Sequence, residues 1–239
     1  MNNKVLKWFL IVIVNLITSI RLIGAFSLPF IYYYKGASVV AIYILVLFLT
    51  DAIDGFLART FKVSTFFGSL MDAMSDKVLN MIAFVILGFE YNLMFAPLII
   101  EIAILYTSYS TYRYGGNVRT HTIGRIKTII LDVLVIISFI LMSLPKLNIQ
   151  SRFIMNLISN TTLIIDIFAM VIIAFCLLAL FDYMKKYNLA RQNPKCMDIK
   201  YEEKNRKKVK QIIKELFDTK YYEKHRTESI MKQLYLNKK

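Results

Sequence analysis

Four aspartates stand at regular spacing within one short stretch of this chain, between long apolar runs. The stretch reads Asp51-x-x-Asp54-Gly55-x-x-Ala58-Arg59, eight further residues, and then Gly68-x-x-x-Asp72-x-x-x-Asp76. An ionisable side chain inside a bilayer costs several kcal/mol, so such a cluster marks a functional site by default. Carboxylate oxygens are the preferred ligands of hard cations such as Mg²⁺ and Mn²⁺. The stretch is therefore a candidate site for metal-assisted chemistry.

The spacing predicts that the aspartates are carried on two helices. At 3.6 residues per turn, the residues from Asp51 to Ala58 that the pattern fixes share one helix face, and Gly68, Asp72 and Asp76 share another. Two such helices facing each other would bring the four carboxylates together, with small residues between them. We interpret this arrangement as a pocket for a divalent metal and a phosphate. The alternative is that the aspartates are helix-end charges near a membrane surface.

A phosphoanhydride substrate would add negative charge to this pocket, so one or two cations, Mg²⁺ or Mn²⁺, are expected there. Paired metals would stabilise the attacking and leaving groups of a displacement at phosphorus. The small side chains at Gly55, Ala58 and Gly68 leave room for a flat base and a diphosphate. Arg59 presents a fork of donors that suits a phosphate oxygen.

The whole pattern resembles the signature of the CDP-alcohol phosphotransferase (CDP-alcohol phosphatidyltransferase) family, D-x-x-D-G-x-x-A-R-(x8)-G-x-x-x-D-x-x-x-D, at every fixed position. The resemblance implies that Asp51, Asp54 and Asp72 coordinate the metals. It makes Asp76, beside the same metals, the general base for the acceptor hydroxyl. The implied reaction is attack by an alcohol on the lipid-bearing β-phosphorus of a CDP-alcohol, with release of CMP.

A second element, Asn15-x-x-Thr18-x-x-Arg21, is similar to one that precedes the main motif in phosphatidylglycerophosphate synthases. The resemblance implies that the CDP moiety of CDP-diacylglycerol is bound by Asn15, Thr18, Arg21, Gly55, Ala58, Arg59 and Gly68. The alternative is that Asn15 and Thr18 only cap or kink a helix while Arg21 extends its charge to the membrane surface.

A group of basic residues predicts a site for a phosphorylated acceptor at Arg113, Arg119, Arg125 and Lys127. The resemblance implies glycerol 3-phosphate as that acceptor. Gly124-Arg125-Ile126-Lys127-Thr128 resembles the G-K-x-K-T element of the same synthases. Arginine replaces the usual lysine at 125, the usual glutamine three residues after Thr128 is absent, and Ile100 precedes Glu101 where arginine is typical. The same chemistry with inositol phosphate or serine remains an alternative, and retention of basic loops in the cytosol is another explanation of the charges.

The composition predicts an all-α integral membrane protein. The chain is 57% hydrophobic and only 19% charged, with a net charge of +14. Apolar windows long enough to cross a bilayer predict six transmembrane helices, at 16–34, 37–59, 66–88, 93–113, 123–144 and 161–184. Residues 4–14 are too short to span alone, so an N-terminal interfacial helix is expected there, with one longer tilted first span as the alternative.

Residues 1–184 are expected to form the membrane domain and residues 185–239 a basic cytosolic tail with a helix. The tail holds 17 Lys and Arg against 7 Asp and Glu. The positive-inside rule places both termini and the aspartates on the cytoplasmic side of a membrane, with a bacterial source favoured. The tail helix either packs on the membrane domain or lies on anionic headgroups. Nucleic acid is not an expected partner, and the resemblance implies a homodimer.

Two other classes of protein remain as alternatives. A cation or proton transporter also carries intramembrane carboxylates, but it would place them near the bilayer midplane on broken helices. A catalytically inactive relative would act as a lipid-binding subunit, although no essential position of the motif is lost.

Overall fold

The computed structural model describes residues 3–114, 122–147, 151–192 and 209–225, and every regular element in these ranges is a helix. The prediction of an all-α chain is confirmed there. The long helices are α1 (Asn3–Lys35), α2 (Ala37–Thr60), α3 (Phe66–Glu90), α4 (Phe95–Arg113), α5 (Thr122–Ser143) and α7 (Thr161–Gln192). The short ones are η1 (Asn92–Met94), η2 (Leu144–Leu147), α6 (Arg152–Ser159), α9 (Val209–Leu216) and α10 (Thr219–His225).

Five helical segments of the described chain are long and apolar enough to cross a membrane. They are Trp8–Lys35, Ala37–Thr60, Asn92–Thr111, Ile126–Ser143 and Thr161–Gln192. Helix α3 has 25 residues, a sufficient length, but it carries Asp72, Asp76 and Lys77 within its first half. The sixth predicted span therefore stays a prediction, and it is the one that bears the second half of the aspartate motif.

The first helix replaces two predicted elements, an interfacial helix at 4–14 and a membrane span at 16–34. Residues 4–14 do not form a separate helix, because α1 runs unbroken from Asn3 to Lys35. The polar side chains that follow residue 14 are accommodated within this one helix. The Thr18 hydroxyl donates to the Val14 carbonyl at 3.1 Å, and the Ser19 hydroxyl donates to the Asn15 carbonyl at 2.8 Å. Such bonds to the preceding turn satisfy a hydroxyl inside a helix, so a single long helix results.

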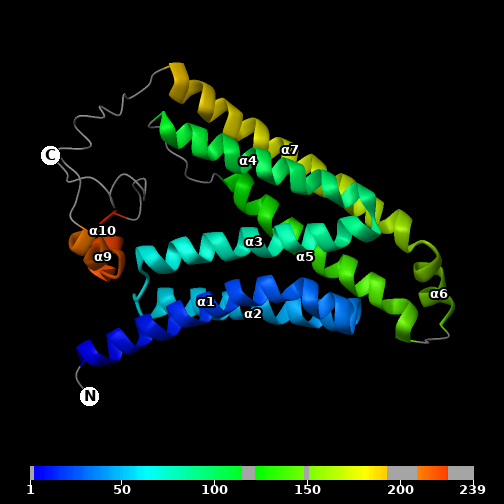
Figure 1. The fold of residues 1–239 in the computed structure, drawn as a ribbon, viewed down its shortest axis with the longest axis horizontal. Coiled ribbons are helices and arrows are strands. Elements are labelled where there is room, and N and C mark those ends of the chain that lie inside the picture. The colour runs from blue at the N-terminus through cyan, green and yellow to red at the C-terminus, as the bar shows by residue number, and fades with distance from the viewer. Residues whose placement is uncertain (1–2, 115–121, 148–150, 193–208, 226–239) are drawn as a thin grey trace.

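The helices pack as two groups that share α5. Helix α1 contacts α2 and α3, α4 contacts α7, and α5 contacts both α2 and α7. Figure 1 shows α1, α2 and α3 side by side in blue to cyan, with α4 and α7 paired on the other side of α5. The buried core joins these groups through apolar side chains that include Leu28, Ile44, Phe84, Phe139 and Ile172.

The connections that place the aspartates are short. Gly36 alone separates α1 from α2, and its φ of 78° lies in the left-handed region that glycine adopts at little cost. Residues 61–65 join α2 to α3, and Thr65 caps α3 by accepting a hydrogen bond from the Gly68 amide at 3.1 Å. These two turns hold α1, α2 and α3 as neighbours, so polar residues from all three can meet.

Candidate active site

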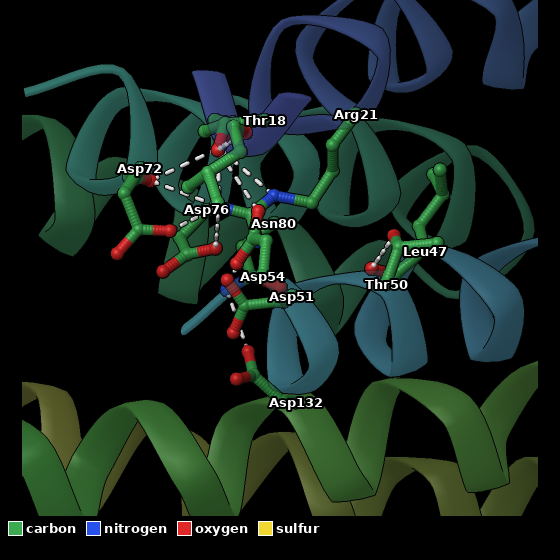
Figure 2. A network of polar contacts seen from close by, with 12 residues as sticks. Thr18, Arg21, Leu47, Thr50, Asp51, Asp54, Asp72, Asp76, Asn80 and Asp132 are labelled. Carbon is green, nitrogen blue, oxygen red and sulfur yellow. Dashed lines mark hydrogen bonds and ion pairs between the residues drawn. The ribbon is translucent and has the colours of Figure 1, made fainter. Parts of the chain in front are cut away.

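Arg21 lies at the centre of the aspartate motif, with an exposed side-chain fraction of only 1%. Its guanidinium forms ion pairs with Asp51 of α2 and with Asp72 and Asp76 of α3. The nitrogen–oxygen distances are 2.5 Å to Asp72 and 3.2 Å to Asp76. Figure 2 shows the side chain reaching from α1 into this group. The first helix therefore supplies the positive charge that balances carboxylates on the next two.

Ser75 fixes the orientation of the guanidinium. Arg21 donates to the Ser75 hydroxyl from Nε at 2.9 Å and from Nη2 at 2.6 Å. The same hydroxyl donates to the Asp72 carbonyl at 3.0 Å, and Ser75 is fully buried. A buried arginine whose donors are all directed in this way holds one geometry, because each alternative position leaves a polar group unsatisfied.

Three of the four aspartates are close enough to share a cation. Single carboxylate oxygens of Asp51, Asp72 and Asp76 lie within 4.8 Å of one another. Their side chains remain 36%, 48% and 35% exposed, respectively, so an ion and a substrate can reach them. Such an all-oxygen set fits a hard divalent cation. A cation bound there shares these oxygens with Arg21.

The fourth aspartate lies to one side of this group. Asp54 is buried, with 3% of its surface exposed, and its Oδ2 accepts a hydrogen bond from Thr18 at 2.8 Å. Thr18 thus orients a carboxylate of α2 from α1. The helix face predicted for Asn15, Thr18 and Arg21 is turned toward the aspartate motif. Thr18 contacts Asp54, Arg21 contacts Asp51, and Asn15 lies beside Gly68.

The small residues of the motif differ in how much room surrounds them. A Cβ added at Gly68 would lie 2.7 Å from Oδ1 of Asn15 and 3.3 Å from Oγ1 of Thr65. At Gly55 the nearest atom to an added Cβ would be Nη1 of Arg59, at 3.5 Å. Gly68 is therefore required by close approach of α1 to α3. Arg59 extends back over Gly55, one turn earlier on α2, and is exposed at the end of that helix.

The predicted acceptor residues are only partly described. Arg113 ends α4 and Arg125 lies in the first turn of α5, whereas Arg119 falls outside the described residues. Lys127 is buried, with 6% of its surface exposed, and forms an ion pair with Glu101 of α4. Glu101 also accepts from the Cys176 thiol at 3.5 Å. Lys127 is thus already paired with a carboxylate.

Several polar residues at the site were missed by sequence reasoning. Asn80 of α3 donates to Asp132 of α5 at 2.7 Å, and its own Oδ1 is buried without a hydrogen-bond partner. Position 80 continues the four-residue spacing of 68, 72 and 76 by one more turn, a signal that was present in the sequence. Ser75 and the counterion role of Arg21 had no comparable signal, because both depend on how α1 packs against α3.

Comparison with known proteins gives a family and several partial relatives. The sequence profile described as CDP-alcohol phosphatidyltransferase matches residues 11–178. A CDP-diacylglycerol–glycerol-3-phosphate 3-phosphatidyltransferase from Yersinia enterocolitica is 41% identical over 68 residues, covering 28% of this chain and 36% of that protein. The protein of the same name from Salmonella choleraesuis is 39% identical over 71 residues, covering 30% and 37%.

A further relative is a cardiolipin synthase (CMP-forming) and mitochondrial hydrolase fusion protein from Schizosaccharomyces pombe, 34% identical over 65 residues, or 27% of this chain and 11% of that protein. The matched segments thus span little more than a third of the bacterial relatives. No solved structure matches this chain.

Proposed function

Because this chain belongs to the CDP-alcohol phosphatidyltransferase family, we propose that it transfers a phosphatidyl group from CDP-diacylglycerol to an alcohol and releases CMP. The favoured acceptor is glycerol 3-phosphate, the product then being phosphatidylglycerophosphate. The observation that carries the proposal is the set of three carboxylates from α2 and α3 within 4.8 Å of one another, at positions that the family's motif requires.

The reaction needs one bond to form and one to break at a single phosphorus. The acceptor oxygen attacks the β-phosphorus of the donor, the anhydride bond to the α-phosphate breaks, and CMP leaves. Asp76 takes the proton of the acceptor hydroxyl, and its 35% exposed side chain is open to that approach. Asp76 also belongs to the group of three carboxylates, so it would lie beside the bound metals while acting as the base.

The remaining residues bind and orient. Asp51, Asp54 and Asp72 would hold one or two Mg²⁺ or Mn²⁺ ions, which, when bound, neutralise the phosphate oxygens of the donor. Gly55 and Ala58 would leave space beside α2 for the CDP moiety, whereas Gly68 would let Asn15 approach closely enough to contact it. Asn15 and Arg59 are the side chains nearest to Gly68 and Gly55. Thr18 holds Asp54 at 2.8 Å.

The acceptor proposal rests on the basic residues between positions 113 and 127 of the sequence and on the acceptor named for the bacterial relatives, glycerol 3-phosphate. Arg113, Arg119 and Arg125 suit bidentate binding of a phosphate. Lys127 joins them only if Glu101 releases it, since the two are buried together. A different acceptor, such as inositol phosphate or serine, would leave the carboxylate chemistry unchanged.

The proposal also includes the setting of the enzyme. We place it in a bacterial cytoplasmic membrane, as a homodimer, with both termini and the carboxylates facing the cytosol, where glycerol 3-phosphate is soluble. The apolar helices support a membrane protein. The positive-inside distribution of Lys and Arg supports the orientation.

The test is CMP release by the purified protein in detergent with CDP-diacylglycerol and Mg²⁺ or Mn²⁺, each acceptor being added singly. We expect release with glycerol 3-phosphate, lost with a chelator and reduced about a thousandfold by Asp76→Asn, within the range for removal of a general base. Release with another alcohol would replace the acceptor. No release with any acceptor from folded protein would overturn the enzyme proposal and favour the transport or lipid-binding alternatives.

A further inference from the structure

The two short helices of the basic tail lie against the beginning of α3. Phe217, which follows α9, lies with its ring centroid 5.0 Å from that of Phe67. Tyr221 and Tyr222 of α10 meet the ring of Phe66 edge-on, at 5.8 Å and 5.0 Å. Figure 1 shows α9 and α10, in orange to red, beside the first turn of α3. Of the two predicted positions for the tail helix, the structure shows packing on the helical domain.

These contacts lie where the connection between the two halves of the aspartate motif enters α3. Phe66 is fully buried, and Val63 and Thr65 are each only 2% exposed, whereas Lys62 is exposed. On the tail side, Thr219 at the start of α10 is 7% exposed. A five-residue connection would ordinarily lie on the surface. Here its part next to α3 is enclosed, and it leads into the two phenylalanines that the tail contacts.

The enclosed connection is joined directly to the donor-binding end of the site. Phe66 and Phe67 stand between Thr65, which caps α3, and Gly68, whose amide donates to Thr65. Gly68 in turn approaches Asn15 of α1 so closely that even a methyl group would not fit. A movement of the two phenylalanines would therefore move Gly68 relative to Asn15, which are two of the residues proposed to bind the CDP moiety.

The tail also borders the same region from outside. A cavity of about 710 Å³ lies between the first half of α1 and the tail, and its lining includes Trp8, Asn15, Ile213 and Phe217. Asn15 thus faces Gly68 and also lines a cavity whose far wall is α9. The tail lies wholly beyond residues 11–178, which the family profile matches.

We propose that α9 and α10 are a positioning element for the donor site: Phe217, Tyr221 and Tyr222 hold the α2–α3 connection so that Gly68 and Asn15 bind the CDP moiety of the donor lipid. This inference rests on the proposed function for the identity of the ligand. It predicts that loss of the aromatic contacts weakens donor binding, while acceptor binding and the chemical step are retained.

The experiment uses the full-length protein and two test variants, Phe217→Ala and Tyr222→Ala. The controls are Phe217→Trp, which keeps an aromatic ring, and Lys210→Ala, at an exposed position on α9. The dissociation constant of CDP-diacylglycerol in detergent is measured first, then the KM for donor, the KM for acceptor and kcat. Hydrogen exchange of the peptide covering residues 61–68 reports docking of the tail. Donor binding does not require turnover, so the inference is tested even if the proposed reaction is not found.

We expect the two alanine variants to raise the dissociation constant and KM for the donor about three- to tenfold, the size expected for a lost aromatic contact. Exchange at 61–68 should become faster in them, and Phe217→Trp and Lys210→Ala should match the unaltered protein. Faster exchange with unchanged donor affinity would show that the tail only stabilises the fold and would overturn the inference. Unchanged exchange would show that the tail is not docked. An unaltered protein that binds donor without releasing CMP would overturn the proposed function alone.

Discussion

At the scale of single residues, Arg21 changes how the aspartate motif is understood. The spacing of the motif suggested four carboxylates without a neighbouring cation, which would repel one another unless a metal were bound. Arg21 instead pairs with three of them from a neighbouring helix. A divalent cation held by these carboxylates would therefore compete with the buried guanidinium. Metal binding would then weaken the ion pairs of Arg21, and removal of Arg21 would increase the need for metal.

We predict that Arg21→Met makes the stability of the protein strongly dependent on metal. In chelator its melting temperature should fall, because Asp51, Asp72 and Asp76 lose a counterion and each charge-assisted hydrogen bond contributes about 1.5–3 kcal/mol. Added Mg²⁺ should raise the melting temperature more in the variant than in the unaltered protein. Arg59→Met, at an exposed position, is the matched control. An equal response to Mg²⁺ in the variant and the unaltered protein would show that the ion binds elsewhere.

The two motif glycines should respond differently to alanine. Gly68→Ala places a methyl group 2.7 Å from Asn15, so α1 or α3 must shift, and overpacking of this kind costs about 1–3 kcal/mol. Gly55→Ala meets no atom closer than 3.5 Å and should leave the melting temperature unchanged. CMP release is measured for the same variants, so that a loss of activity can be separated from a loss of stability. A loss of activity in Gly55→Ala at an unchanged melting temperature would mark space that the substrate uses. Equal melting temperatures for both variants would contradict the close contact at Gly68.

Single-residue features could be predicted from the sequence where they follow the spacing along one helix. The motif spacing predicted four carboxylates together, and the structure groups three of them, with Asp54 to one side. The three-residue spacing of Asn15, Thr18 and Arg21 predicted one shared helix face. The partners of Arg21 could not be predicted, because they depend on the depth at which α1 packs between α2 and α3. Asp54 was expected among the metal ligands and is also a hydrogen-bond acceptor of Thr18, a contact with no signal in the spacing.

At the scale of helices, the ion pair of Glu101 and Lys127 joins α4 to α5. Both residues are buried, at 7% and 6% exposed. A buried ion pair adds little net stability, but removal of one partner leaves an uncompensated charge. The pair also determines whether Lys127 is available to an acceptor phosphate.

We therefore predict that Lys127→Met and Glu101→Gln each destabilise the protein by about 3–5 kcal/mol, because the remaining partner stays charged. The double variant should be more stable than the sum of the two single losses implies. Unfolding by denaturing detergent, followed in a double-mutant cycle, measures this coupling. Strict additivity would contradict the ion pair. A higher KM for the acceptor in Lys127→Met, with a lower one in Glu101→Gln, would further indicate that Glu101 competes with the acceptor phosphate.

Helix positions followed the apolar runs closely, whereas some helix ends did not. The windows at 37–59 and 123–144 correspond to α2 and α5 within one residue at each end. Helix α7 continues to Gln192, beyond the window that ended at 184, because polar residues can extend a helix once it has left an apolar environment. The prediction divided this region into an interfacial helix at 4–14 and a span at 16–34 because a length rule counts only the residues needed to cross a bilayer. The structure has one helix from Asn3 to Lys35, since a helix can extend beyond the bilayer.

At the scale of the whole molecule, the short turns alternate the direction of the helices. The first turn of α1, the last turn of α2 and the first turn of α3 lie at one end of the bundle, together with α9 and the end of α7 (Figure 1). Helix α2 has 24 residues and is about 36 Å long at 1.5 Å per residue, more than the hydrocarbon thickness of a bilayer. The exposed residues Lys35 and Lys62, just beyond its two ends, should therefore lie on opposite sides of a membrane.

Single cysteines at these positions test the orientation. In a background with Cys176→Ala and Cys196→Ser, Lys62→Cys should react with an impermeant maleimide only in inverted vesicles, and Lys35→Cys only in right-side-out vesicles. The positive-inside rule gives this direction. Reversed labelling would place the aspartates outside the cytosol, away from a soluble phosphorylated acceptor. Labelling of both positions from one side would contradict the span itself.

Arg21 lies on the first helix of the chain, and this position has a consequence for membrane insertion. A chain is synthesised from its N-terminus, so the helix with Arg21 emerges from the ribosome before Asp51, and Asp51 before Asp72 and Asp76. If α3 enters the bilayer as α2 does, each acidic helix would therefore meet a guanidinium that is already there. A carboxylate in hydrocarbon without a partner is costly. The order of residues along the chain is thus also an order of charge neutralisation during membrane insertion.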